Sequence, residues 1–231
     1  MIIRQLFDSD SFTYTYLLGD EQSGKAVFID PVLEKMGLYL QLLEELSLTL
    51  SVALDTHVHA DHITALGALR AATGCQTFIG NGGDVDCADN GLEDGQVITV
   101  GSITVRVVYT PGHTNDSYTF LVDLNNQRYA FTGDTLLIRG SGRTDFQQGS
   151  SDQLYDTLHQ KLMTLPEDTI VYPGHDYKGF TVSTIGEEKK CNPRINLPTR
   201  EAFIAHMDSL DLPNPKMMDV AVPANRSCGN I

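Results

Sequence analysis

A short run of potential metal ligands, Thr56-His57-Val58-His59-Ala60-Asp61-His62, constrains the fold of this chain more than any other feature. Three imidazoles and a carboxylate crowded into six residues are unfavourable without a cation that they share. The run follows residues 48–54, an apolar and partly β-branched stretch typical of a buried strand. It precedes residues 63–73, where apolar side chains recur at helical spacing. The sequence therefore predicts a strand-to-helix loop that presents these ligands at the mouth of a sheet.

Three further candidate ligands each follow a predicted strand. Because strand ends meet at one edge of a sheet, all of them could converge on the histidine run. In Pro111-Gly112-His113 the glycine allows a sharp bend that aims the imidazole. The three ligands are His113 after residues 105–110, Asp134 after residues 129–132, and His175 after residues 169–172.

These histidines are interpreted as metal ligands in preference to ordinary surface residues. A single histidine after a strand is more often a hydrogen-bonded surface residue than a ligand. The cluster together with three strand-end repeats makes a shared metal site the better hypothesis. By contrast, His159 and His206 lie in the helix patterns of residues 152–165 and 199–210. Both are interpreted as helix-surface or packing residues.

The order of these motifs resembles the metallo-β-lactamase superfamily. T-H-x-H-x-D-H is followed by P-G-H, G-D and P-G-H, over roughly residues 10–180. The resemblance implies an α/β fold, the αββα sandwich, in which two mixed β-sheets lie face to face with helices outside. It also implies that the metals lie at one sheet edge.

Further segments are similar to the persulfide dioxygenases, also called sulfur dioxygenases or the ethylmalonic encephalopathy protein family. With them the resemblance covers nearly the whole chain, as a single catalytic domain over residues 1–231 with a family-specific tail at residues 191–231. The segments are residues 137–149, residues 172–184, Glu187-Glu188, Asn192-Pro193-Arg194, residues 222–225 and Cys228-Gly229.

The resemblance leaves the number of metals as the main ambiguity. All seven positions that bind two metals in hydrolytic relatives such as glyoxalase II are occupied here. In persulfide dioxygenases one Fe(II) per subunit is held by the residues that correspond to His57, His113 and Asp134. Two imidazoles and one carboxylate leave three positions open, as in non-haem Fe(II) oxygenases. The other four positions, which then orient ligands and waters or hold a second metal, are His59, Asp61, His62 and His175.

The implied reaction is the oxidation of glutathione persulfide by O2 to sulfite and glutathione, in sulfide detoxification. Glutathione carries two carboxylates, so cations are expected at the pocket mouth. Arg143 is the leading candidate, with an ion pair to Asp145 as its alternative, and Arg194 is a weaker one. Tyr177 lies two residues beyond His175, so its hydroxyl is expected near the metal as a catalytic or substrate-binding group beside that histidine. Burial of Tyr177 in the core is the alternative.

Two other function classes are weighed. A dinuclear thioester hydrolase of the glyoxalase II type, acting on S-acylglutathione, would use a metal-bound hydroxide. Such relatives carry a helical C-terminal region with basic residues, whereas the tail after residue 192 is short and ends in a different motif. A non-enzymatic metal-binding or scaffold role is third, and the intact ligand set argues against it.

Composition and charge limit the kinds of partner that this protein is expected to bind. The formal net charge of −14 leaves no basic stripe for a phosphate backbone, so nucleic acid is not expected as a partner. The longest apolar stretches have the length of strands, short of the roughly 20 residues of a membrane span. Residues 1–10 show no targeting pattern, so a cytoplasmic location is expected. The family suggests a homodimer and a separate persulfide-supplying enzyme.

The four cysteines are Cys75, Cys87, Cys191 and Cys228. They form no CxxC pair and suit a reducing compartment. Cys75 is expected to be a small buried residue. Cys228 lies in a family-typical motif, where structural packing is preferred over a catalytic role.

Overall fold

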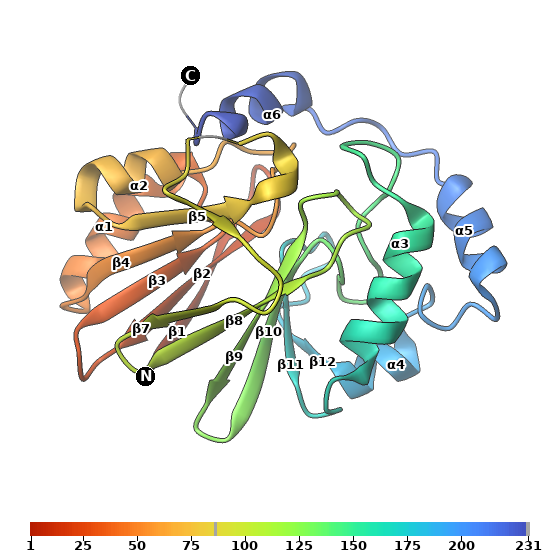
Figure 1. The fold of residues 1–231 in the computed structure, drawn as a ribbon, viewed down its shortest axis with the longest axis horizontal. Helices are drawn as coiled ribbons and strands as arrows, with labels where there is room; N and C mark the ends of the chain where they lie inside the picture. Colours follow the sequence, from red (N-terminus) through yellow and green to blue (C-terminus); the bar gives the residue numbers. More distant parts are fainter. Residues whose placement is uncertain (86, 230–231) are drawn as a thin grey trace.

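The computed structural model describes residues 1–85 and 87–229. Within these ranges the strands form two six-stranded sheets, ordered β1-β2-β3-β4-β5-β6 and β12-β11-β10-β9-β8-β7. Each sheet contains both parallel and antiparallel neighbours. The sheets face each other with helices outside them (Figure 1). The predicted α/β sandwich with two mixed sheets is confirmed.

The first sheet consists of β1 (Ile2–Asp8), β2 (Thr13–Asp20), β3 (Lys25–Ile29), β4 (Thr49–Leu54), β5 (Gln76–Gly80) and β6 (Asn90–Leu92). The second sheet consists of β7 (Val97–Val100), β8 (Ile103–Tyr109), β9 (Tyr118–Leu124), β10 (Gln127–Gly133), β11 (Ile170–Pro173) and β12 (Ser183–Thr184). The helices are α1 (Met36–Glu45), α2 (Leu66–Thr73), α3 (Ser151–Asp156), α4 (Ile185–Cys191), α5 (Arg200–Asp208) and α6 (Met218–Arg226).

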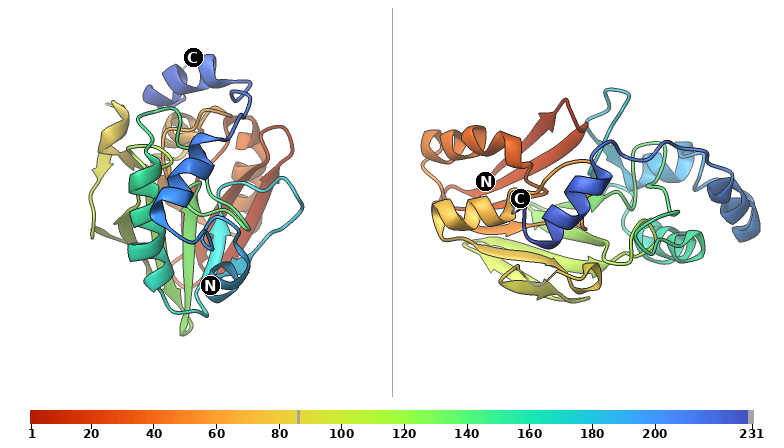
Figure 2. Two further views of the ribbon diagram at one scale, coloured as in Figure 1. Left: turned by 90° about the vertical axis from the view of Figure 1, so that its right-hand side faces the viewer. Right: turned by 90° about the horizontal axis from the view of Figure 1, so that it is seen from above.

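The main core lies between the two sheets. In β8 buried and exposed residues alternate at first, because one face of this strand packs on the core and the other faces solvent. Every residue of β2 is buried, since one face meets the second sheet and the other meets α1 and α2. A separate cluster joins α3, α4 and α5 to β11. Figures 1 and 2 show α5 lying beside α3.

The metal hypothesis depends on strands that end just before the candidate ligands, and the structure has these strand ends at the predicted places. β4, β8, β10 and β11 end immediately before or within a few residues of their ligands. The helix predicted from residue 63 begins later, at Leu66, because Thr64 Oγ1 accepts a hydrogen bond from Leu66 N at 3.2 Å and Ala65 N donates to Pro31 O. Residues 152–165 are helical but change pitch after α3, with a π turn at Thr157–Lys161 and a 3-10 turn at Leu162–Thr164.

The cysteines depart from the expectation. Cys87 and Cys228 are joined by a disulfide across a sequence separation of 141, with 5.8 Å between their Cα atoms. The expectation of unpaired thiols is therefore wrong for Cys87 and Cys228. The spacing of cysteines along the chain could not indicate this bond, because only the tertiary fold brings the two residues together. Cys75 is buried, as predicted, and Cys191 is an exposed free thiol. Cys228 is 1% exposed, which confirms its structural packing.

The helices within residues 1–85 and 87–229 offer no apolar stretch long enough to cross a membrane.

Candidate metal centre

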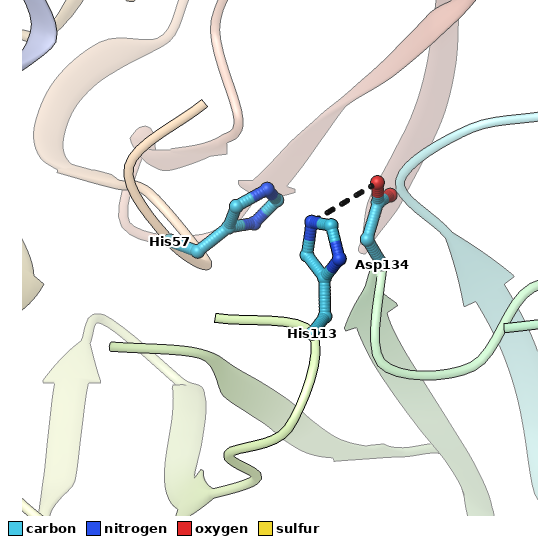
Figure 3. Close-up of side chains that lie close together, drawn as sticks. All are labelled: His57, His113 and Asp134. Carbon is cyan, nitrogen blue, oxygen red and sulfur yellow. Dashed lines mark ion pairs between the residues drawn. The ribbon is translucent and has the colours of Figure 1, made fainter. Parts of the chain in front are cut away.

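Three of the predicted ligands form one group. His57, His113 and Asp134 offer ligand atoms that all lie within 4.8 Å of one another. They come from the loops that follow β4, β8 and β10, and Figure 3 shows them converging, with His113 Nε2 lying 3.6 Å from Asp134 Oδ2. The ring centroids of His57 and His113 are 4.9 Å apart. The fold therefore brings the ends of three strands that are far apart in the sequence close together, and this places two imidazoles and a carboxylate side by side.

The remaining predicted ligands form a second, adjoining group. The ligand atoms of His59, Asp61 and His62 also lie within 4.8 Å of one another. His175 bridges the two groups, because its Nε2 lies 3.6 Å from Asp61 Oδ1 and 3.7 Å from Asp134 Oδ1. The structure thus brings all seven predicted positions together.

Three of the five imidazoles are oriented through their Nδ1 atoms. His113 Nδ1 donates to the carbonyl of Arg143 at 2.7 Å, and His175 Nδ1 donates to the carbonyl of Phe12 at 3.2 Å. Since a carbonyl only accepts, these contacts leave the lone pair on Nε2 of both rings. His57 Nδ1 lies 2.9 Å from Thr56 Oγ1. Outer hydrogen bonds of this kind are typical of metal-binding histidines.

The inward atoms fit a divalent cation. His59 Nδ1, His62 Nε2 and Asp134 Oδ1 are buried and lack a hydrogen-bond partner among the described residues. Buried polar atoms without a partner are rare unless an ion or water serves them. Burial, together with neighbouring imidazoles, holds the pKa of His57 and of His59 well below the ordinary range. Both rings are therefore neutral, which is the form that binds metal.

A pocket of about 800 Å³ opens onto both ligand groups. This volume lies within the roughly 300–1,000 Å³ of typical small-molecule sites. Residues 212–217, which connect α5 to α6, form part of its wall. Its cationic lining residues are Arg139, Arg143, Lys178, Arg194 and Lys216.

Arg143 makes the ion pair named as its alternative. Its Nε and Nη2 each donate to the carboxylate of Asp145 at 2.6 Å. Its Nη1 donates to the carbonyl of Pro213 at 2.7 Å, and Nη2 also reaches Leu212 O at 3.2 Å. The guanidinium therefore fastens the pocket segment of residues 212–217, while the Arg143 carbonyl orients His113. A direct substrate contact by Arg143 stays a prediction.

Arg143→Ala tests this arrangement. We expect the melting temperature to fall by roughly 2–10 °C, because the loss of charged hydrogen bonds worth about 1–3 kcal/mol frees residues 212–217. Asp145→Asn removes the ion pair but keeps the contacts to Leu212 and Pro213, so it should cause a smaller fall. Thermal unfolding and KM measured together separate the roles: an unchanged melting temperature with a raised KM in Arg143→Ala would instead support direct substrate binding.

Arg194 differs from the other arginines of the pocket. Its Nη1 donates to Ser141 O and, at 2.9 Å, to Ser141 Oγ. Among the ion pairs of the described residues none includes Arg194. Burial lowers the pKa of this guanidinium, and no acidic neighbour opposes the effect. A partly buried cation without an acidic partner is costly, and an anionic ligand would relieve that cost.

Tyr177 lines the pocket and does not lie in the core. Its side chain is 64% exposed, so the alternative of core burial is wrong. The ring stacks parallel to that of His175, with 5.9 Å between the centroids. Partial desolvation inside the pocket, with the carboxylates of Asp134 and Asp61 nearby, raises the pKa of Tyr177, so the phenol keeps its proton at neutral pH. Its contact with metal or substrate stays a prediction.

Two residues that support the metal loop were missed in the sequence. Asp30 follows β3, and its carboxylate accepts from Thr56 N at 2.7 Å and lies 3.2 Å from His59 Nε2. Its position after a strand was an available signal. Asn225, in α6, is fully buried and donates to the carbonyls of His59 and His62 at 2.9 and 2.8 Å. Only the three-dimensional fold shows that role. As expected, His159 packs on Tyr155 and His206 is exposed.

Comparison with known proteins supports the same interpretation. A model of the metallo-beta-lactamase superfamily matches residues 9–175. The human protein "Persulfide dioxygenase ETHE1, mitochondrial" is 50% identical over 230 residues, which cover 99% of this chain and 89% of that protein. The crystal structure of ETHE1 from Myxococcus xanthus matches with a TM-score of 0.95 and 55% identity, covering 99% of this chain and 100% of that chain.

A hydrolase is also similar, at lower identity. A probable hydroxyacylglutathione hydrolase from Schizosaccharomyces pombe is 34% identical over 166 residues, which cover 71% of this chain and 64% of that protein.

The chain belongs to the metallo-β-lactamase superfamily and, within it, to the ETHE1 persulfide dioxygenase family, whose members are enzymes. Both parts of the resemblance drawn from the sequence are confirmed, and the hydrolase alternative corresponds to a more distant relative.

Proposed function

We propose that this protein is an Fe(II)-dependent persulfide dioxygenase that converts glutathione persulfide, O2 and water to glutathione and sulfite. The observation that carries the proposal is the group formed by His57, His113 and Asp134 at the floor of the pocket. Two imidazoles and one carboxylate are the ligands of non-haem iron oxygenases, which keep other positions open for substrate and oxygen. When bound there, Fe(II) would supply the electrons that activate O2.

A single metal is favoured by how Asp61 is already engaged. Its Oδ2 accepts from Thr13 Oγ1 at 3.1 Å and lies 3.0 Å from His62 Nδ1. Burial acts against ionisation, but His175 and His62 outweigh it and lower the pKa of Asp61, so this carboxylate is ionised. Ionisation by itself suits metal binding, but the Oδ2 atom that already contacts a hydroxyl and an imidazole is less available to a second metal. It serves instead to orient His62.

The pocket walls suit a dianionic thiol derivative. Arg194 supplies an unneutralised guanidinium, and Lys178 and Lys216 also line the pocket. Apolar residues such as Phe12, Phe146 and Ile138 exclude water from the region between them and the metal group. The chain therefore binds the carboxylates of the tripeptide by charge and leaves its sulfur directed towards the floor.

Two residues near the floor can handle protons. Burial lowers the pKa of His175, but the carboxylates of Asp134 and Asp61 outweigh it, so that this pKa is raised. The Tyr177 ring stacks on His175 and keeps its hydroxyl protonated. We assign to this pair the orientation of the persulfide and of water at the pocket floor.

The experiment that tests the function combines two measurements. Protein purified without oxygen should contain close to one iron per chain and little zinc by elemental analysis. Adding glutathione persulfide should start O2 uptake, with sulfite formed in equal amount. Two metals per chain together with hydrolysis of S-acylglutathione, and no O2 uptake, would instead establish the thioester hydrolase.

Arg194→Gln tests the substrate-binding part. A charged hydrogen bond is worth about 1.5–3 kcal/mol, so kcat/KM for glutathione persulfide should fall roughly tenfold to hundredfold, mainly through KM. Iron content and melting temperature should stay near those of the wild type, because no carboxylate of the chain loses its partner. A small persulfide without carboxylates is the control and should be unaffected. Equal losses with both substrates would contradict a carboxylate-binding role.

A homodimer, a cytoplasmic location and a separate persulfide-supplying enzyme also belong to this proposal. They derive from the family and from the sequence. Sedimentation of the purified protein tests the dimer.

A further inference from the structure

We propose that the Cys87–Cys228 disulfide is a thiol-exchange site that sets how firmly the metal loop is held. The inference builds on the metal centre of the proposed function, but its first two readouts do not depend on metal or activity. The site consists of the two sulfur atoms and of α2, against which both cysteines are held. The reactant that it fits is a thiolate of low molecular weight.

The C-terminal side of the disulfide is attached directly to the metal loop. Asn225 donates to the carbonyls of His59 and His62, and its Oδ1 accepts from Thr64 N at 2.8 Å. Cys228 follows three residues later and donates its backbone N–H to Asn225 O at 3.0 Å. α6 lies over the loops near α2 at the top of Figure 1. Whatever fixes Cys228 therefore fixes the helix end that supports two candidate ligands.

The backbone around Cys228, next to the disulfide, is in an unusual conformation. Cys228 has φ 56 and Gly229 has φ 80, both in the left-handed region. A side chain other than glycine is disfavoured there. A Cβ on Gly229 would lie 2.0 Å from Thr64 O, so the chain passes very close to the metal loop at this point. Release of Cys228 would remove one of the restraints that hold this segment against Thr64.

Helix α2 keeps the two cysteines together even without the bond. Gly67 N donates to the carbonyl of Cys228 at 2.9 Å. Arg70 Nη1 donates to the carbonyl of Cys87 at 2.7 Å. Both anchors lie on one short helix and neither involves a sulfur atom. The bond can therefore break and form again without a search by the chain, which is what a reversible site requires.

The difference in exposure between the two cysteines determines which sulfur atom an external thiolate attacks. Cys228 is 1% exposed, whereas Cys87 is only partly buried. A thiolate attacks Cys87 Sγ, the disulfide breaks, and its electron pair leaves with Cys228 Sγ, which takes up a proton. A second thiolate then attacks the mixed disulfide at the external sulfur. The products are two protein thiols and one external disulfide, so two electrons pass from the thiols to the protein.

The first test counts thiols in the protein as isolated. Titration in denaturant without reductant should find two thiols, those of Cys75 and Cys191, and four after reduction. Finding four before reduction would overturn the proposal. Reduction, or Cys87→Ser, should lower the melting temperature by roughly 5–15 °C, since the bond closes a long loop. Cys191→Ser is the matched control: it should leave the melting temperature unchanged and lower the thiol counts only by its own thiol, to one before reduction and three after it.

The second test connects the bond to the metal loop. Protein loaded with Fe(II) is mixed with bipyridine under anaerobic conditions, and the rate of iron release is followed by absorbance. Release should be about tenfold faster in the reduced protein and in Cys87→Ser than in the oxidised protein, because the support of His59 and His62 is loosened. Equal rates in all three would overturn the coupling. If the protein binds no iron, the proposed function fails, while the thiol count and the melting temperature still report on the disulfide.

Discussion

Replacing His57, His113 or Asp134 with alanine should remove iron and persulfide oxidation together. Each side chain supplies one ligand atom of the group. Loss of an outer partner already costs about 10–100-fold in metal affinity, so loss of a direct ligand should cost more. Elemental analysis after anaerobic purification should find less than about a tenth of the iron of the wild type. O2 uptake with glutathione persulfide should be lost in parallel.

The neighbouring histidines provide the matched comparison. His59→Ala and His62→Ala remove imidazoles from the same loop and at similar burial. Under the single-iron proposal these variants should keep most of their iron, although it should be released more readily. Complete loss of iron in them would contradict the assignment of His57, His113 and Asp134 as the ligand set. A fall from two metals to one would point to the dinuclear hydrolase.

The convergence of the candidate ligands was predictable because its signal is local. Each candidate follows a strand of apolar and β-branched residues, and the order of strands places their ends at one edge. His57 and His59, two residues apart, lie with ring centroids 4.2 Å from each other, as extended backbone requires. Short-range signals in the sequence are therefore enough to bring these candidate residues to one edge of the sheets.

The supporting contacts were not predictable because they depend on distant segments. Asn225 reaches His59 across 166 positions of the chain. The partner of Cys87 lies 141 positions away. Whether Arg143 is free for substrate depends on Asp145 and on the carbonyls of residues 212–213, which only the folded chain brings near it. Sequence patterns identify residue types that can act, whereas tertiary contacts decide which of them are already occupied.

Tertiary contacts also explain the structural role of the family motif Glu187-Glu188. Glu188 is fully buried and accepts from Arg139 N at 2.9 Å, Ser183 Oγ at 2.6 Å and Asn192 Nδ2 at 2.8 Å. It also forms an ion pair with the guanidinium of Arg139. One carboxylate thus joins α4, β12 and the pocket wall that carries Arg139. These residues hold the pocket in shape.

Glu188→Ala should therefore be strongly destabilising. Removing this buried carboxylate should cost about 3–5 kcal/mol, because several buried donors lose their acceptor while Arg139 keeps only its exposed partner Glu187. For a chain of this size that predicts a melting temperature roughly 6–20 °C lower. Glu187 is the matched control, since it pairs with the same arginine but its side chain is 47% exposed. Glu187→Ala should cost no more than about 1 kcal/mol. Equal losses in the two variants, measured by thermal unfolding, would show that burial of Glu188 is not what makes this contact strong.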